Sequence, residues 1–470
     1  MKTRLFMAST VAAALAAGVL FSGCTGGDIE KTGLVKLSKH CYAYIASGPT
    51  TAEGHGVNSG FVVGDDGVLV VDSRFTPALS RQLLKAIRSV TDRPIEFLVD
   101  TSYLPDHTWG NATFKKAGAK IIARRETAES IARYSPVYKE YYKQFNSDAY
   151  ELIKDVDIVL PDSFLDDEMK LDLGGVTVVL RYPGPACTAG DCIVSVPRER
   201  VVYAGEILSN GYHPNLGDSG ADYDNWVEVL GELSKSGAKR FVPGRGHVCG
   251  KKTITANVNY IRTLVEACKE SIAAGKPIDD AKHTILMPEY ADYLQSNLLP
   301  FNIQAVYRKS ALGIVRPPFR FELPEGYMLY DGAGGTKAGM LEWGIDDASG
   351  YRELKVEWRP TLIKEVIVQD VRDAVARLNN GSEPYDFRVN GSGKITVAGS
   401  KAPKLMGRWV YKRAANLQGG GRWVWTIFLG NGRIYSVRAL TDARMDREKE
   451  KRNIEELERA IAGFKPLPEK

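Results

Sequence analysis

Over roughly the first 290 residues, short apolar runs typical of buried strands alternate with segments whose apolar residues recur every three or four positions. The segment 77–91, for example, places Leu79, Leu83, Leu84 and Ile87 on one helix face. We predict strands within residues 41–47, 59–73, 95–101, 118–124, 176–208 and 239–248, and helices over 77–91, 126–145 and 225–237. Because strands and helices alternate without long breaks, this part of the chain is predicted to have a layered α/β fold.

A different pattern follows a pair of prolines that marks a linker over residues 313–320. Residues 407–440 alternate apolar and polar side chains in three strands separated by Gly-rich turns. The chain closes with a charged helix whose single apolar stripe contains Ile454, Leu457, Ile461 and Phe464. We therefore predict a first domain over residues 33–312 and a smaller α+β domain over residues 321–470.

The N-terminus has the organisation of an export signal, with basic residues, an apolar run and small residues before Cys24. The apolar run is too short and too rich in alanine to be predicted as a transmembrane helix. We predict a signal peptide over residues 1–23, lipidation of Cys24 and a polar tether over residues 24–32. Thr25 stands where an inner-membrane retention aspartate would lie, so we expect a lipoprotein of the outer membrane that faces the periplasm. Cleavage to a soluble exported protein is the alternative.

Length and composition indicate the class of protein, and the predicted export indicates the redox state of its cysteines. The 470 residues are 44% hydrophobic and 25% charged, as in soluble globular proteins of more than one domain. A formal charge of +5 neither indicates nor excludes nucleic-acid binding, and we expect no nucleic-acid partner. Export would place the remaining cysteines in an oxidising compartment; they are Cys41, Cys187, Cys192, Cys249 and Cys268. An odd number leaves at least one free thiol or an intermolecular pair.

Five loops follow one another in the first domain: "VNSGFVVGDDGVLVVD", "VDTSYLPDHTWGN", "YPGPACTAGD", "VVYAGEIL" and "FVPGRGHV". In this order they resemble the metallo-β-lactamase superfamily, in particular its exported branch related to quinoprotein-relay metallohydrolases. The later stretch "AAGKPIDDAKHTILMPEYADYL" resembles the C-terminal helices of that branch. The resemblance implies an αββα sandwich with its site at one edge, where loops of both sheets meet. It also implies that Asp72 bonds backbone groups of these loops.

The first metal-binding loop that the resemblance implies is incomplete. Active members read His-x-His-x-Asp-His there, and this chain has Ser102, Leu104, Asp106 and His107 at those positions. A catalytic zinc ion needs three Cys, His or carboxylate ligands and a water molecule. The loss of two histidines therefore removes most of the shell of the first metal.

The later ligand positions are altered as well. They correspond to Cys187, Glu206 and Arg245, where the family has a histidine, an aspartate and a histidine. Arginine remains a cation in proteins and cannot bind a metal. We therefore predict that the dinuclear site is degenerate and that Arg245 pairs with Asp106, Glu206 or both, since a guanidinium fork matches carboxylates.

A rearranged site for a single divalent metal, with zinc as the first choice, is the competing hypothesis. Its possible ligands are Asp106, His107, Cys187 and Glu206, with Asp106 as ligand or catalytic base. The surrounding pocket would contain Ser102, Leu104, Arg245, His247, His55, His213 and Arg124. For each histidine, a structural hydrogen bond is the simpler interpretation. For Arg124 the alternatives are an anion-binding cavity shared with Arg245 or an ordinary salt bridge.

The cysteines near this site leave several alternatives open. Cys187 could form a disulfide with Cys192 or Cys249, or remain a buried thiol. A nucleophilic Cys187 activated by His107 would be a different chemistry, and redox chemistry through Cys187 and Cys192 a third. Spacing alone does not decide between them.

The smaller domain resembles the PsbP-like fold, on the strength of "FRFELPEGYM", "GRWVYKR", "GRWVWTIFLGNGRIYSVRAL" and the final helix. Members of that fold mostly dock on other proteins, so an interaction role follows by analogy. We expect an exported, non-catalytic protein that binds a small molecule or an envelope protein. The alternative is a metal-dependent hydrolase of ester, thioester or lactone-like bonds.

Overall fold

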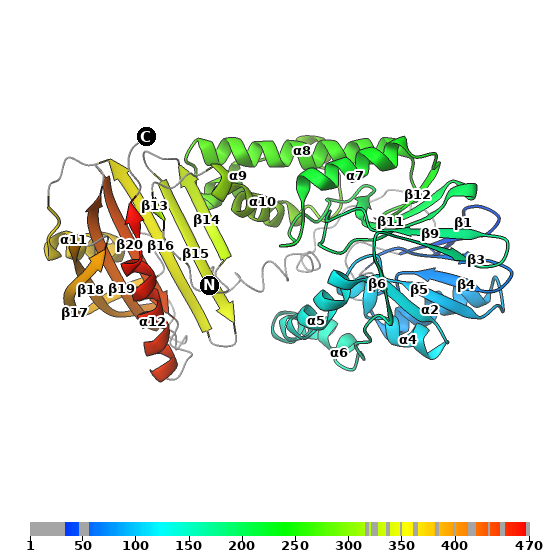
Figure 1. Cartoon of the computed structure of the whole chain (residues 1–470), viewed down its shortest axis with the longest axis horizontal. Helices are drawn as coiled ribbons and strands as arrows, with labels where there is room; N and C mark the ends of the chain where they lie inside the picture. Colours follow the sequence, from blue (N-terminus) through cyan, green and yellow to red (C-terminus); the bar gives the residue numbers. More distant parts are fainter. Residues whose placement is uncertain are drawn as a thin grey trace.

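The structure is a computed structural model with two domains side by side (Figure 1). It describes residues 33–46, 56–314, 319–320, 328–334, 339–347, 350–360, 365–380, 385–397, 400–411, 420–430, 433–441 and 447–466. The predicted signal peptide, Cys24, the tether over residues 24–32 and His55 lie outside the described residues. Residues 315–318 of the predicted linker do so too.

The first sheet of the first domain has seven strands, ordered in space as they are along the chain. They are β1 (Gly33–Lys36), β2 (Cys41–Ile45), β3 (Ser59–Val63), β4 (Val68–Val71), β5 (Ile95–Val99), β6 (Lys120–Arg124) and β7 (Ser163–Leu165). Strands β1 to β4 pair antiparallel, whereas β4 to β7 pair parallel. Every residue of β4 is buried, because one face of the strand contacts the second sheet and the other contacts helices.

The second sheet has five strands in the order β12-β11-β10-β9-β8. Their bounds are β8 (Glu168–Asp172), β9 (Thr177–Arg181), β10 (Ile193–Val196), β11 (Val201–Ser209) and β12 (Arg240–Arg245). Strands β8 to β11 pair antiparallel, and β12 runs parallel to β11. Aliphatic side chains of both sheets, among them Val71, Val99, Leu180 and Val194, form one buried layer between them.

Helices cover the outer faces of the two sheets (Figure 1). Beside the first sheet lie α2 (Pro77–Arg88), α3 (Pro105–Thr108), α4 (Asn111–Lys116), α5 (Arg125–Phe145) and α6 (Ser147–Ile153). Beside the second lie α7 (Tyr223–Lys235), α8 (Lys251–Ala273), α9 (Ile278–Thr284) and α10 (Leu298–Ile314), with short 3₁₀ turns η2 (Pro197–Glu199) and η3 (Pro288–Tyr290) in the connections. The predicted αββα sandwich is therefore confirmed.

Helix α2 shows how the sequence specifies one of these elements. The Thr76 hydroxyl accepts a hydrogen bond from the Leu79 backbone N–H at 3.2 Å, and Pro77 occupies the first turn. The helix buries Leu79, Leu83 and Ile87, as its apolar spacing predicts. None of the described helices combines the length and the apolar character needed to cross a membrane.

The second domain is built on a seven-stranded antiparallel sheet in the order β14-β15-β16-β20-β19-β18-β17. The strands are β14 (Met328–Gly334), β15 (Gly339–Asp347), β16 (Gly350–Pro360), β17 (Tyr385–Val397), β18 (Ser400–Tyr411), β19 (Gly420–Gly430) and β20 (Arg433–Thr441). The three strands predicted over residues 407–440 correspond to the end of β18, β19 and β20. A small pair of strands, β13 (Phe319–Arg320) and β21 (Lys465–Pro466), joins the start of this domain to its end.

Two helices, α11 (Val368–Asn380) and α12 (Arg447–Ala462), pack on opposite faces of this sheet. The α12 face buries the predicted stripe of Ile454, Leu457, Ile461 and Phe464, and Phe464 lies just beyond the end of the helix. The α11 face buries Trp423 and Trp425. At the edge of the sheet, β14 contacts α8, α9 and α10 of the first domain.

At the end of the sandwich opposite to these helices, the β3–β4 turn contacts the β8–β9 turn. The N–H of Asp66 donates to the Leu173 carbonyl at 2.8 Å, and that of Asp65 donates to the Gly174 carbonyl at 2.8 Å. A Cβ atom added to Gly64 would overlap the Leu173 carbonyl oxygen. Glycine at this position therefore lets the two sheets approach one another.

We predict that Gly64→Ala lowers the free energy of unfolding by about 1–3 kcal/mol, since rigid backbone must move to make room. Gly231→Ala is the matched control, because Gly231 lies within α7 with open space around it. That change should stabilise the protein by about 0.5–1 kcal/mol through helix propensity. Urea unfolding of both variants tests the pair, and an unchanged midpoint for Gly64→Ala would show that the close approach is not needed.

Candidate functional site

The candidate site lies where strands of both sheets end at the same edge of the sandwich. Asp72 follows β4, and Asp106 and His107 lie on α3, which follows β5. Glu206 lies on β11 and Arg245 at the end of the parallel strand β12. The carboxyl ends of parallel strands meet at one edge, which brings residues distant in sequence together.

A local irregularity of β11 brings its residues to this edge. The β11–β12 register shifts at Gly205, which has φ 53°. A Cβ atom at Gly205 would overlap the Thr101 side chain of the loop after β5. Glycine therefore permits both the left-handed backbone and the close passage of β11 beside that loop.

Arg245 forms ion pairs with two carboxylates. Its Nη2 donates to Asp106 Oδ2 at 2.7 Å, and its Nε donates to Glu206 Oε1 at 3.2 Å. The three side chains are 9%, 2% and 1% exposed. The predicted pairing of Arg245 with Asp106 and Glu206 is present in full.

The charges in this cluster hold one another ionised. Burial by itself raises the pKa of Glu206, but the Arg245 charge and a hydrogen bond with His107 outweigh it and lower the pKa to about 2. Burial likewise lowers the pKa of Arg245, and the charges of Glu206 and Asp106 reverse that effect and raise it. Glu206 is therefore a carboxylate and Arg245 a cation at any physiological pH.

His107 lies between two carboxylates. Its Nδ1 is 3.0 Å from Asp72 Oδ2, and its Nε2 is 3.3 Å from Glu206 Oε2. Burial lowers the pKa of His107, but Asp72 and then Glu206 outweigh that effect and raise it well above its usual value. The two carboxylates thus favour the imidazolium form of His107.

Asp72 has the structural role that the family resemblance implies. Its carboxylate accepts from the Thr101 N–H at 2.8 Å and from the Thr101 hydroxyl at 2.7 Å. Its own backbone has φ 61°, a conformation that few residues other than glycine adopt. Asp72 thus fixes both the loop after β5 and the ring of His107.

Comparisons with known proteins identify the family of the first domain. Residues 52–245 match the family model described as Metallo-beta-lactamase superfamily. The chain contains a metallo-β-lactamase superfamily domain. Two curated relatives are the beta and alpha subunits of 2,4-dinitroanisole O-demethylase from Nocardioides sp. (strain JS1661), 25% and 24% identical.

The matched regions cover 50% and 47% of this chain, and 67% and 61% of the two subunits. A third curated relative is a metallo-beta-lactamase type 2 from Elizabethkingia meningoseptica, 21% identical over 47% of this chain and 80% of that protein. Among solved structures, a metallo-beta-lactamase from Pontibacter korlensis is 19% identical with a TM-score of 0.40, over 49% of this chain and 99% of that one.

The metallo-β-lactamase domain does not provide the metal ligands that its family implies. Ser102 and Leu104 are buried where histidines would stand, and Leu104 packs among Phe75, Tyr103 and Trp109. Within the described part of the chain, no three His, Cys, Asp or Glu side chains are grouped so that they could hold a metal ion. Since Arg245 pairs with Asp106 and Glu206, and Ser102 and Leu104 supply no histidine, these residues do not fit a zinc centre.

Cys187 is a buried thiol in this domain. All five described cysteines are free, so of the alternatives that the sequence left open for Cys187 the structure has the buried thiol, and no disulfide with Cys192 or Cys249 is formed. The Cys187 Sγ donates to the Asn215 carbonyl at 3.3 Å. Burial, followed by the charge of Asp191, raises the pKa of Cys187 well above its usual value. A nucleophilic pair with His107 does not form, because both ring nitrogens of His107 face carboxylates.

The other residues predicted for the pocket have separate partners. His213 Nδ1 lies 2.8 Å from the Tyr260 hydroxyl, and its ring packs edge-on against Tyr260 and Tyr293. The half-buried His247 accepts a hydrogen bond at its backbone carbonyl from Asn210 Nδ2. These histidines therefore have structural roles in the described contacts.

Arg124 is a salt-bridged arginine. Its Nε lies 2.9 Å from a carboxylate oxygen of Glu126, and its Nη1 donates to the carbonyls of Leu165 and Asp166. Its guanidinium also stacks over the Tyr182 ring at 4.2 Å. These contacts favour the ordinary salt bridge over the anion-binding cavity shared with Arg245.

Two further buried carboxylates lie near the site and were not predicted. Asp218 accepts from the Tyr103 hydroxyl and from the Gly220 N–H, and Asp191 accepts from both polar groups of Thr188. Burial raises the pKa of Asp218, and raises that of Asp191 to about 7. The sequence signals were the Asp-x-Gly and Thr-x-x-Asp spacings, which are typical of side-chain-capped turns.

We predict that Arg245→Met lowers the free energy of unfolding by about 3–5 kcal/mol, because it leaves buried carboxylates without their cation. Arg240→Met on the exposed start of the same strand is the matched control and should stay within about 0.5 kcal/mol of the parent. Urea unfolding at pH 7 measures both. Equal stabilities of the two variants would show that the guanidinium does not neutralise the site.

The loss of folding stability caused by Arg245→Met should also depend on pH. The folded-state pKa of Glu206 is depressed, so its stabilisation is present above the unfolded value of about 4.3 and is lost as the pH falls toward about 2. The stability gap between Arg245→Met and the parent should therefore narrow below about pH 4. If the difference in free energy of unfolding between the variant and the parent stays constant from pH 7 to pH 3, the lost stability does not come from the charge of Arg245.

Cysteine mapping provides a further prediction. In the native protein, Cys187 and Cys192 should resist alkylation, because both are buried and burial raises both pKa values. After unfolding without reductant, both should be alkylated fully. Peptide mass spectrometry decides the matter: a disulfide-linked peptide, or rapid native labelling of Cys187, would contradict the free buried thiols.

Proposed function

We propose that this metallo-β-lactamase domain is a non-catalytic member of its superfamily, used for binding or assembly at the cell envelope. The observation that carries the proposal is the Arg245 guanidinium between Asp106 and Glu206. A dinuclear hydrolase uses two metal ions to polarise its substrate and to generate hydroxide. A guanidinium supplies charge to the same carboxylates but does not lower the pKa of water in this way.

The remaining polar groups do not replace that chemistry. His107 lies between Asp72 and Glu206, which favour its imidazolium form, and that form cannot accept a proton from water. Glu206 uses one carboxylate oxygen for Arg245 and the other for His107. The cluster is therefore suited to holding the loops of the domain in place, which is what a binding scaffold requires.

Export and anchoring remain part of this proposal. They are supported by the apolar N-terminal segment that ends in Cys24. For the second domain we propose a PsbP-like fold and an envelope protein or small molecule as partner. The antiparallel sheet with α11 and α12 on opposite faces supports that assignment.

One observation supports the alternative of a hydrolase with a single metal ion. Asp106 Oδ1 and Ser102 Oγ are buried and have no hydrogen-bond partner among the described residues. A cation there would still need two further ligands. His55, outside the described residues, is one residue that the sequence offers for that role.

The metal content of the exported protein separates the two functions. The non-catalytic function predicts less than about 0.2 zinc per chain by elemental mass spectrometry, since the site lacks three ligands. The combined variant Ser102→His, Leu104→His, Cys187→His and Arg245→His, which restores the four altered histidine positions and keeps Glu206 as a carboxylate, is the matched control and should bind zinc. Stoichiometric zinc in the parent, together with hydrolysis that disappears in Asp106→Ala, would establish the hydrolase.

A further inference from the structure

We propose that the second domain carries an oxyanion-binding site built from a row of three arginines, Arg388, Arg408 and Arg422. The ligand class is a compact dianion of the phosphate type. The inference rests on strand register, exposure and charge in the second domain, and is independent of the function proposed for the first.

Strand register places the three arginines directly beside one another. Arg388 on β17 is opposite Arg408 on β18, and Arg408 is opposite Arg422 on β19. Cα atoms of directly opposite residues lie about 4.5–5.5 Å apart, and their side chains project from the same face of the sheet. Like charges in that position destabilise a sheet, so the row needs a negatively charged partner.

The row lies on the face that α12 occupies. Phe387 and Trp423, the strand neighbours of Arg388 and Arg422, point to the opposite face and are buried there against α11. The side chains of Arg408 and Arg422 are 46% and 40% exposed, and Arg388 is exposed as well. The row is therefore accessible to a solute.

A single carboxylate from α12 lies beneath this row. Glu450 Oε2 lies 3.5 Å from Arg408 Nη1 and 3.2 Å from Arg422 Nε, and its side chain is 3% exposed. Among the described contacts of the row, this one carboxylate faces more than one guanidinium group, so positive charge is in excess there. In the described contacts Glu450 uses one nitrogen of each of these two arginines, and each guanidinium group carries further N–H donors that could bind a ligand.

The position of Glu450 at the start of α12 limits the repulsion that its carboxylate exerts on an anion. Glu450 lies in the first turn of α12, where unpaired backbone N–H groups give a helix end a partial positive charge. Glu450 also restrains two of the three side chains, which lowers the entropy that a ligand must remove on binding.

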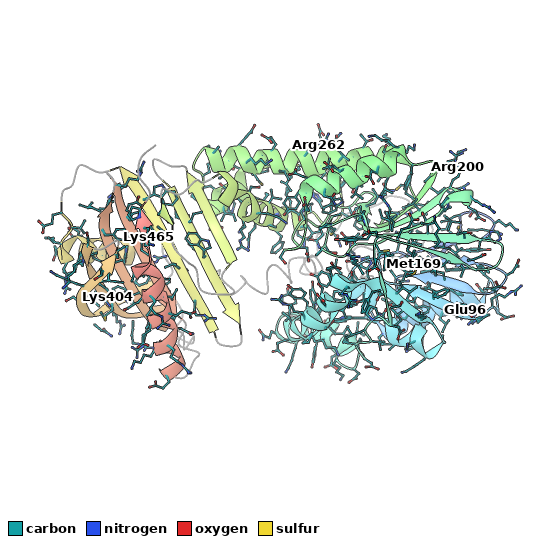
Figure 2. The ribbon with its side chains drawn as sticks, in the orientation of Figure 1. Glu96, Met169, Arg200, Arg262, Lys404 and Lys465 are labelled. Carbon is teal, nitrogen blue, oxygen red and sulfur yellow. The ribbon has the colours of Figure 1, made fainter. Side chains whose placement is uncertain are left out.

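A neighbouring lysine on the same face is paired with a carboxylate of its own. Lys404, labelled in Figure 2, lies four residues before Arg408 on β18. Its Nζ is 2.9 Å from a carboxylate oxygen of Glu458 on α12, and the side chain is 13% exposed. Lys404 thus has a carboxylate of its own, whereas the arginine row shares one.

The geometry of guanidinium groups selects the ligand class. Their planar forks bind two oxygens of one phosphate-type group at once, which a lysine cannot do. A dianion would balance the excess positive charge in the described contacts of the row. The same group can come from free phosphate or from the headgroup of a phosphate-monoester lipid, and solution binding can tell these sources apart.

The test is calorimetric titration of the full chain at low ionic strength with inorganic phosphate and with a short-chain phosphatidic acid below its micelle concentration. Sodium acetate at equal ionic strength is the monoanion control. Arg388→Gln and Arg408→Gln should each weaken binding at least about tenfold, since each removes a charge-assisted fork. Arg452→Gln, an exposed arginine on α12, is the matched control and should bind like the parent.

Arg408→Lys keeps the positive charge but removes the planar pair of donors of the guanidinium. If the ligand is bound through both donors, this variant should also weaken binding. Circular dichroism of each variant verifies that the domain is folded. Binding of phosphate assigns the site to a free oxyanion, and binding of phosphatidic acid alone assigns it to a lipid headgroup. Binding of neither ligand, or equal binding by Arg408→Gln and Arg452→Gln, would overturn the site.

Discussion

Asp72, Asp106 and Glu206 meet at the edge where the two sheets of the sandwich end, and all three are buried. Three carboxylates out of water repel one another and must be neutralised. Here the protein does so with its own cations. Arg245 bridges Asp106 and Glu206, and His107 bridges Glu206 and Asp72. The positions of the loops at this edge depend on this alternation of negative and positive side chains.

The alternation ties together elements that are far apart in the chain. Arg245 and Glu206 come from the second sheet, whereas Asp72, Asp106 and His107 come from loops of the first. The network therefore joins the sheets at one edge, as the contact of Gly64 with Leu173 does at the other end. The ion pairs of Arg245 and His107 are thus contacts between elements of both sheets.

The sequence predicted most of the fold and part of the site, for identifiable reasons. Strand β4 is a continuous apolar run and β5 is apolar except for Glu96, so the apolar pattern located both strands. Strands β7 and β8 escaped prediction because they are short or half-exposed edge segments. The pairing of Arg245 followed from placing a cation among known ligand positions. The contact of Tyr103 with Asp218 spans 115 residues and has no local signature, so only the structure reveals it. The choice between a thiol and a disulfide at Cys187 stayed open, because spacing carries no information on Cα–Cα distance.

The central claim is that Arg245 occupies the position of a metal ion. Zinc-edge anomalous diffraction from crystals grown with about 1 mM zinc tests it most directly, because an excess over any structural-site affinity would fill a competent site. The account predicts Arg245 between Asp106 and Glu206 and no anomalous peak beside them. An anomalous peak bound to Asp106 and Glu206, with the guanidinium displaced, would contradict it.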